Sequence, residues 1–156
     1  MTLVRILVDG HGLLEQWKDL APGKPRQSEA AREELIGWLT RYSDTTGTAI
    51  SVAFEGQPSP PDLVLLPPAG PVEVLFSRPG QKPSQFLERL AQRMHGHGEF
   101  MVVADAVAKP EAIRAASGTV CACSSFIKTV QDTLADLEQQ IASFNQKENQ
   151  RFTEHG

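Results

Sequence analysis

The chain has 156 residues, of which 40% are hydrophobic and 22% charged, proportions that are ordinary for one globular domain. A chain of this length buries roughly two thirds of its unfolded surface and folds without cross-links, so we expect Cys121 and Cys123 to be small buried residues without a disulfide. The net charge of −4 excludes a strongly basic nucleic-acid platform. Neither end shows a signal peptide or a membrane-length apolar run, and we expect a cytoplasmic protein.

The first structural signal is a short apolar run at residues 4–8 that ends in Asp9, Gly10, His11 and Gly12, after which apolar residues recur at helical spacing. This pattern predicts a buried strand that stops at a carboxylate and turns into a helix. Ligands of parallel sheets bind outside the carboxyl ends of the strands, which makes Asp9 a candidate site residue and the next three residues its neighbours. Alternatively, Asp9 only caps the following helix. This stretch alone leaves both interpretations open.

Helical and strand patterns alternate along the rest of the chain. Helical spacing predicts one helix over residues 13–20 and a longer one from Ser28 to about Gly47. Strand-like runs follow at residues 48–54, 72–76, 100–104 and 119–122, and the helices expected between them cover residues 84–94, with Ser84 as the cap, and 110–117. Strands separated by helices predict an α/β fold, with a mostly parallel sheet of about five strands flanked by helices.

A proline-rich loop interrupts this alternation, because eight of the 11 prolines lie between Pro58 and Pro83. Proline lacks an amide donor and therefore brackets strands without occupying their middles. We interpret residues 63–66 as an edge strand or a packed loop. No Lys or Arg occurs between Arg41 and Arg78, which makes this loop a poor contact for phosphate groups.

The last expected helix begins at Ser124 and carries an apolar stripe with alternating steps of three and four residues, at Ile127, Val130, Leu134, Leu137, Ile141 and Phe144. This is the spacing of a coiled-coil seam, held for about two and a half heptads. We favour packing of the stripe against its own domain over a dimer seam, because convincing coiled coils sustain about three heptads or more. We expect one domain over residues 1–145, and a polar tail over 146–156 that frays.

Acidic residues follow three of the expected strands, namely Asp9, Glu55 and Asp105. The carboxyl ends of parallel strands share one edge of a sheet, so we expect at least two of these side chains to converge. Carboxylates gathered in one crevice repel each other and are tolerated when Mg²⁺ or Mn²⁺ is bound between them. The alternative is that these acids only belong to turns, where Asp is common.

The motif ILVDGHGLL at residues 6–14 resembles the opening motif of YacP-type NYN domains, a bacterial branch of the PIN-like nucleases. Later motifs resemble the same family in the same order, and these are VAFEG at 52–56, VEVLFS at 72–77 with SQFLERL at 84–90, VVADA at 102–106 and TVCACSSFIKTV at 119–130. The similarity covers most of residues 2–140. It implies a three-layer PIN-like, or Rossmann-like, fold.

The resemblance also implies a function, either a divalent-metal-dependent endoribonuclease or an RNA-binding protein. It implies catalytic roles for Asp9, Asp105 and Glu55, with Asp9 and Asp105 holding Mg²⁺ or Mn²⁺. The implied partner is RNA, with ribosome association as a further expectation and no membrane. The cations available for RNA near such a site are Arg78, Lys82 and Lys109, whereas we expect Arg89 and Arg93 to be solvated surface residues.

Two positions depart from the family pattern. Gly12 stands where the family usually has Asn, and Ser84 stands where it usually has Asp, whose charge a neutral hydroxyl does not replace. The loop that is often basic in the family also lacks Lys and Arg here. The alternative function is therefore a catalytically inactive NYN-fold protein that acts as a binding or scaffold module. It would bind a second copy or a protein partner through the proline-rich loop or the C-terminal helix.

Overall fold

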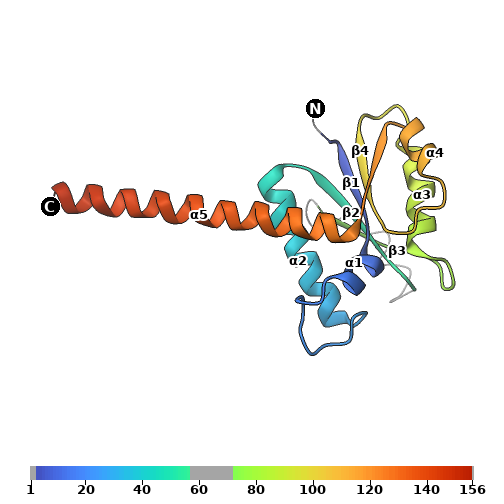
Figure 1. Ribbon diagram of the computed structural model, residues 1–156, viewed down its shortest axis with the longest axis horizontal. Helices are drawn as coiled ribbons and strands as arrows, with labels where there is room; N and C mark the ends of the chain where they lie inside the picture. Colours follow the sequence, from blue (N-terminus) through green and yellow to red (C-terminus); the bar gives the residue numbers. More distant parts are fainter. Residues whose placement is uncertain (1–2, 57–71, 156) are drawn as a thin grey trace.

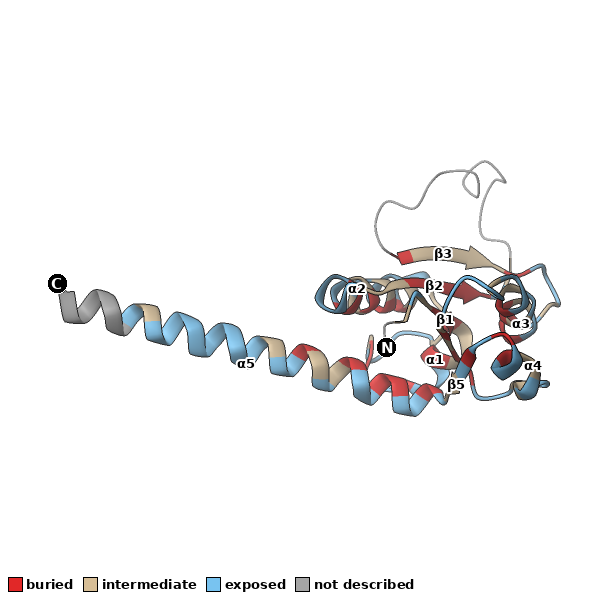
Figure 2. Ribbon diagram, turned by 90° about the horizontal axis from the view of Figure 1, so that it is seen from above, coloured by how far each residue is buried: buried red, intermediate tan, exposed pale blue. Residues whose placement is uncertain are grey.

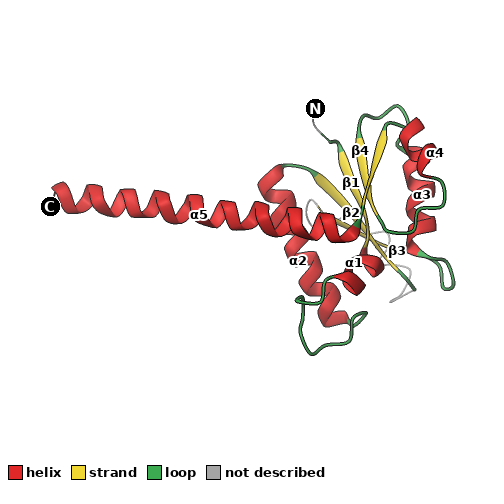
Figure 3. Ribbon diagram, viewed as in Figure 1, coloured by secondary structure: helices red, strands yellow, loops and turns green. Residues whose placement is uncertain are grey.

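The protein, described by a computed structural model over residues 3–56 and 72–155, is built on one all-parallel sheet of five strands (Figure 1). The strands of this described part are β1 Arg5–Asp9, β2 Ala49–Phe54, β3 Val72–Phe76, β4 Phe100–Val103 and β5 Gly118–Cys121. The helices are α1 Gly10–Gln16, α2 Glu29–Thr46, α3 Pro83–Arg93, α4 Pro110–Ala115 and α5 Cys123–His155 (Figure 3). The expected α/β fold is confirmed, while the run at residues 63–66 lies outside the described residues.

The strand order is β3-β2-β1-β4-β5, which places β1 in the middle of the sheet. Val8 of β1 pairs with Val52 of β2 on one side and with Val103 of β4 on the other. The chain first builds the sheet outward through β2 and β3, and it then returns to the other side of β1 for β4. This reversal creates a switch point between β1 and β4, where open parallel sheets bind their ligands. Asp9, at the carboxyl end of β1, lies at this point.

Helices cover both faces of the sheet and give the molecule three layers. Ile6 and Val8 belong to the core cluster shared with α1, α2 and α5, whereas Leu7 belongs to the cluster shared with α3 and α4. The central strand is therefore buried on both faces, as its continuous apolar run requires. This burial holds the carboxyl end of β1 in a defined position.

Local signals explain most helix ends. The hydroxyl of Ser28 accepts a hydrogen bond from the amide of Ala31 at 3.2 Å and caps α2, and Gly47 ends that helix in the left-handed region with a φ of 75°. The prediction that Ser84 caps α3 was wrong. The helix begins at Pro83, which has no amide to satisfy and a φ suited to the first turn, and Lys82 is its cap residue.

The first helix is shorter than its periodicity predicted, since α1 ends at Gln16. Trp17 and Leu20 are nevertheless buried in the core. The guanidinium of Arg26 donates hydrogen bonds to the carbonyl oxygens of Trp17 and Leu20, each at 2.7 Å, and of Ala21 at 2.8 Å. These bonds satisfy carbonyl groups that have no helical partner in the segment after α1, where the apolar residues pack from a loop.

The final helix, α5, extends far beyond the domain (Figure 2). The prediction that its stripe packs on its own domain is confirmed as far as Leu134, which is 7% exposed. It was wrong for Ile141 and Phe144, which are 51% and 63% exposed. The reason is the length of α5, because its 33 residues span about 50 Å and extend past the surface that α1 and α2 provide. The helix continues to His155, and the fraying expected for the polar tail stays a prediction.

None of the helices within residues 3–56 and 72–155 combines the length and the apolar composition that crossing a bilayer requires.

Candidate functional site

The site is centred on Asp9, the last residue of β1 and the cap residue of α1. Its Oδ1 atom accepts a hydrogen bond from the amide of Gly12 at 3.0 Å, and the residue is only 9% exposed. The capping interpretation is therefore correct, and it leaves the site interpretation intact. The cap orients a buried carboxyl group at the switch point of the sheet.

Asp105 follows β4, the strand next to β1, and lies with Asp9 at the carboxyl edge of the sheet. Its Oδ1 atom accepts a hydrogen bond from the amide of Cys123 at 2.9 Å, at the start of α5. Burial raises the pKa of Asp9 above its usual value, and the charge of Asp105 raises it further, against the opposing effects of the Gly12 amide and of His11. The two carboxyl groups are thus close enough to interact, and each is held by a backbone amide.

A thiol completes this cluster. Cys123 is fully buried at the start of α5, and burial, together with the charges of Asp105 and Asp9, raises its pKa to about 12. It is therefore a neutral thiol at physiological pH. The sequence predicted its burial but not its place beside both acids. A usable signal was that Cys123 lies at the strand-to-helix junction between β5 and α5, as Asp9 lies at the junction between β1 and α1.

Gly12 allows this close arrangement. A Cβ atom at this position would lie 2.9 Å from Asp9 Oδ2 and 3.4 Å from Cys123 Sγ. Because Gly12 has no side chain, the carboxyl group of Asp9 and the thiol of Cys123 lie close to the first turn of α1.

We expect Gly12→Ala to lower the free energy of unfolding by about 1–2 kcal/mol in urea titrations, because the new methyl group displaces the Asp9 carboxyl group. The same substitution in an Asp9→Ala background should cost much less, since the atom it collides with is gone. Equal costs in the two backgrounds would contradict this explanation.

Glu55, the third expected acid, lies on the other side of Asp9. It follows β2, and its Oε2 atom is 3.9 Å from Nδ1 of His11. Because β2 and β4 flank β1 on opposite sides, Glu55 is separated from Asp105. Within the described residues, no group of three or more His, Cys, Asp or Glu side chains is arranged to hold a metal ion.

The remaining expected residues surround this edge of the sheet. Arg78 and Lys82 lie in the loop between β3 and α3, and Lys109 precedes α4; all three are exposed. The amide of Lys109 donates a hydrogen bond to Glu88 Oε1 at 2.9 Å, which ties its loop to α3. Ser84 is 7% exposed in the first turn of α3.

Comparisons with known proteins agree with this architecture. The protein YacP of Bacillus subtilis (strain 168), described as uncharacterized, is 29% identical over 90 residues, which are 58% of this chain and 52% of that protein. The aligned part thus spans about half the length of that relative. The crystal structure of Rae1 (YacP) from Bacillus subtilis superimposes with a TM-score of 0.73 and 21% identity, covering 95% of this chain and 84% of the other.

A mutant form of the same Bacillus protein gives a TM-score of 0.72 at 21% identity, covering 92% of this chain and 84% of that one. These structural matches show a common fold. The family described as the YacP-like NYN domain matches residues 6–155. Because that match spans nearly the whole chain, including the strands that carry Asp9 and Asp105, the protein belongs to the YacP-like NYN domain family.

Proposed function

We propose that this protein is a divalent-metal-dependent endoribonuclease that hydrolyses phosphodiester bonds of single-stranded RNA, with Asp9 and Asp105 as the metal ligands. The observation that carries the proposal is the pairing of a buried carboxyl group with a second one at the switch point of the sheet. Neither acid has an ion pair with a Lys or Arg of the described residues. Burial of Asp9 and the nearby charge of the exposed Asp105 both disfavour the ionised form of Asp9. A bound cation would offset this effect, which supports a metal at this position.

The two acids fit a particular kind of metal site. Mg²⁺ is commonly bound through one or two carboxylates, and it keeps several waters or takes its other ligands from substrate phosphates. Asp9 and Asp105 each use an oxygen for a backbone amide and offer the rest of the carboxyl group to an ion. A bound ion would activate water and stabilise negative charge on the phosphate group that is attacked.

The neighbouring residues have different roles in this proposal. His11 is 38% exposed beside Asp9, and its contact with Glu55 orients the imidazole toward β2. We therefore assign Glu55 to the positioning of His11, whose imidazole lies beside the proposed metal ligands. Arg78, Lys82 and Lys109 are exposed at the same edge of the sheet, where they would contact the RNA backbone.

We expect Asp9→Asn to reduce the cleavage of a fluorescent single-stranded RNA by about a hundredfold or more in the presence of Mn²⁺, because the metal loses a charged ligand. The melting temperature should be equal or higher, since Asn still caps α1 and no longer buries a charge. Gel assays of cleavage and thermal unfolding measure the two effects.

The matched control is Asp19→Asn, the same change at an exposed position in the loop after α1. It should leave cleavage unchanged. Cleavage that persists at the original rate in Asp9→Asn would exclude the proposed role of this residue.

A second candidate function is RNA binding without cleavage. Two features support it. Glu55 is oriented toward His11, and Ser84 carries no charge, so that within the described residues only Asp9 and Asp105 are acids at the switch point. This alternative predicts RNA binding without turnover in Mg²⁺ or Mn²⁺, whereas the endoribonuclease predicts products that disappear when EDTA is added.

A further inference from the structure

Arg32 of α2 is a half-buried cation that has no anionic partner among residues 3–56 and 72–155. Its guanidinium carbon lies 5.9 Å from the centre of the Phe54 ring. No side-chain hydrogen bond or ion pair joins it to another residue of the described ranges, in contrast to Arg26, whose guanidinium donates to three nearby carbonyl groups at 2.8 Å or less. As far as the described part of the chain is concerned, the donor groups of Arg32 are therefore available to a ligand.

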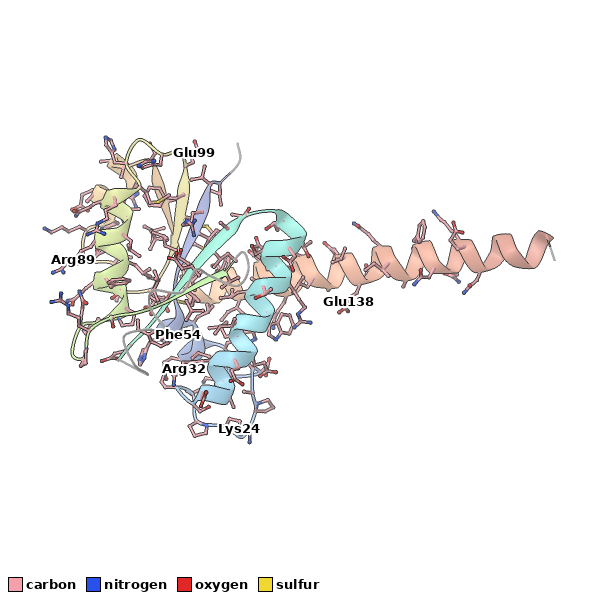
Figure 4. All side chains as sticks on the ribbon, turned by 180° about the vertical axis from the view of Figure 1, so that it is seen from behind. Lys24, Arg32, Phe54, Arg89, Glu99 and Glu138 are labelled. Atoms are coloured by element: carbon pink, nitrogen blue, oxygen red, sulfur yellow. The ribbon has the colours of Figure 1, made fainter. Side chains whose placement is uncertain are left out.

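The position of Arg32 relates it to the proposed metal ligands. Phe54 is the last residue of β2, and its ring packs over Gly10, where a Cβ atom would lie 2.5 Å from a ring carbon. Gly10 directly follows Asp9. In Figure 4, Arg32 and Phe54 lie at one end of the sheet and Glu99, which precedes β4, lies at the other. Arg32 is thus at the carboxyl edge, on the β2 side of Asp9 and opposite Asp105.

The chemistry of this edge requires cations for RNA binding. Asp9, Asp105 and Glu55 repel an RNA backbone, and the chain as a whole carries a net charge of −4. A guanidinium presents donors in a planar fork that matches two phosphate oxygens. The guanidinium carbon of Arg32 is 5.9 Å from the centre of the Phe54 ring, within cation–π range, and this attraction favours a position of the guanidinium near the end of β2.

We propose that Arg32 binds a backbone phosphate of the RNA on the β2 side of the Asp9–Asp105 pair, an inference that rests on the proposed function. Arg32 thereby extends the RNA-binding surface beyond Arg78, Lys82 and Lys109, which the sequence had indicated. The RNA strand would cross the carboxyl edge of the sheet, with the scissile phosphate at Asp9 and Asp105 and a neighbouring phosphate at Arg32.

The chain contains a matched control for this position. Arg41 is also on α2 and also lies over an aromatic ring, with 4.6 Å between its guanidinium carbon and the centre of the Trp38 ring. It is nine residues later, about 14 Å along the helix axis. Because α2 runs toward the start of β2, Arg41 lies near the amino edge of the sheet, away from the proposed site.

The test measures binding of a single-stranded RNA oligonucleotide by fluorescence anisotropy, with the full chain carrying Asp9→Asn so that the RNA stays intact. We expect Arg32→Gln to raise the dissociation constant about tenfold, as for loss of a charged hydrogen bond. The slope of log affinity against log salt concentration should fall by about 0.7, the value for one phosphate contact in a single strand. Arg32→Lys should give a smaller loss, and Arg41→Gln should change affinity less than twofold.

Four proteins are compared, namely the Asp9→Asn chain and its combinations with Arg32→Gln, Arg32→Lys and Arg41→Gln. Circular dichroism melts establish that each of them is folded. Unchanged affinity in Arg32→Gln, or equal losses in Arg32→Gln and Arg41→Gln, would overturn the phosphate contact alone. Cleavage of RNA by the protein that carries only Asp9→Asn would instead overturn the proposed function. The two failures are therefore distinguishable in the same set of proteins.

Discussion

Phe126→Ala is expected to lower the free energy of unfolding by about 3–5 kcal/mol. Phe126 is fully buried on α5, and its ring meets that of Tyr42 on α2 edge-on, with 5.6 Å between the ring centres. Truncation removes the aromatic pair and leaves a cavity between the two helices. Since α5 also supplies the amide that holds Asp105, loosening of its first turns should reduce cleavage as well.

Phe144→Ala is the matched control, because it makes the same change on the same helix at a side chain that is 63% exposed. Its effect should stay within about 0.5 kcal/mol. Urea titrations followed by circular dichroism measure both variants. Should Phe126→Ala fail to fold, Phe126→Leu keeps most of the volume and should give a smaller, measurable loss. Equal effects at the two positions would contradict the packing of α5 described above.

The second large effect is expected for Gly10→Ala, which should lower the free energy of unfolding by about 3 kcal/mol. The added Cβ atom would lie 2.5 Å from the Phe54 ring and 2.9 Å from the carbonyl oxygen of Ala53. A ring is able to turn, but a carbonyl group in the middle of a sheet is not, so β1 and β2 must separate. Asp9 would move with the backbone, and cleavage should fall.

Gly37→Ala provides the control of opposite sign. Gly37 lies within α2, and a Cβ atom there would meet nothing within 4 Å. Replacing this helical glycine should raise the free energy of unfolding by about 0.5–1 kcal/mol. Thermal and urea unfolding of Gly10→Ala and Gly37→Ala measure whether each change lowers or raises the free energy of unfolding. A stabilising effect of Gly10→Ala would show that β1 and β2 are not as close as described.

Local patterns predicted much of the fold. The strand at residues 72–76 and the two ends of α2 were expected at or within one residue of their positions, because apolar runs, an N-cap serine and a left-handed glycine act over a few residues. The predicted end of the first helix was wrong, because a side chain that is distant in sequence contacts this segment. Arg26 satisfies the carbonyl groups after α1 and so allows the helix to end early, a contact that helical periodicity does not contain.

The candidate site was predicted to a similar extent. The strand-end rule indicated Asp9 and Asp105 from the sequence, and the order of strands explains why these two interact while Glu55 does not join them. The positions of Cys123 beside both acids and of Arg32 over Phe54 were not expected. Both depend on side chains that are distant in sequence and meet only when α5 and α2 pack against the sheet.

The sequence by itself determined the alternation of strands and helices, the acids at the strand ends and the helical character of α5, because each follows from periodicity or from neighbouring residues. Tertiary structure alone decided which acids share a switch point, that the Arg32 guanidinium lies near the Phe54 ring, and how far the apolar stripe of α5 is covered. The physical reason is that burial and charge interactions depend on distances through space. These distances are set when all layers pack together.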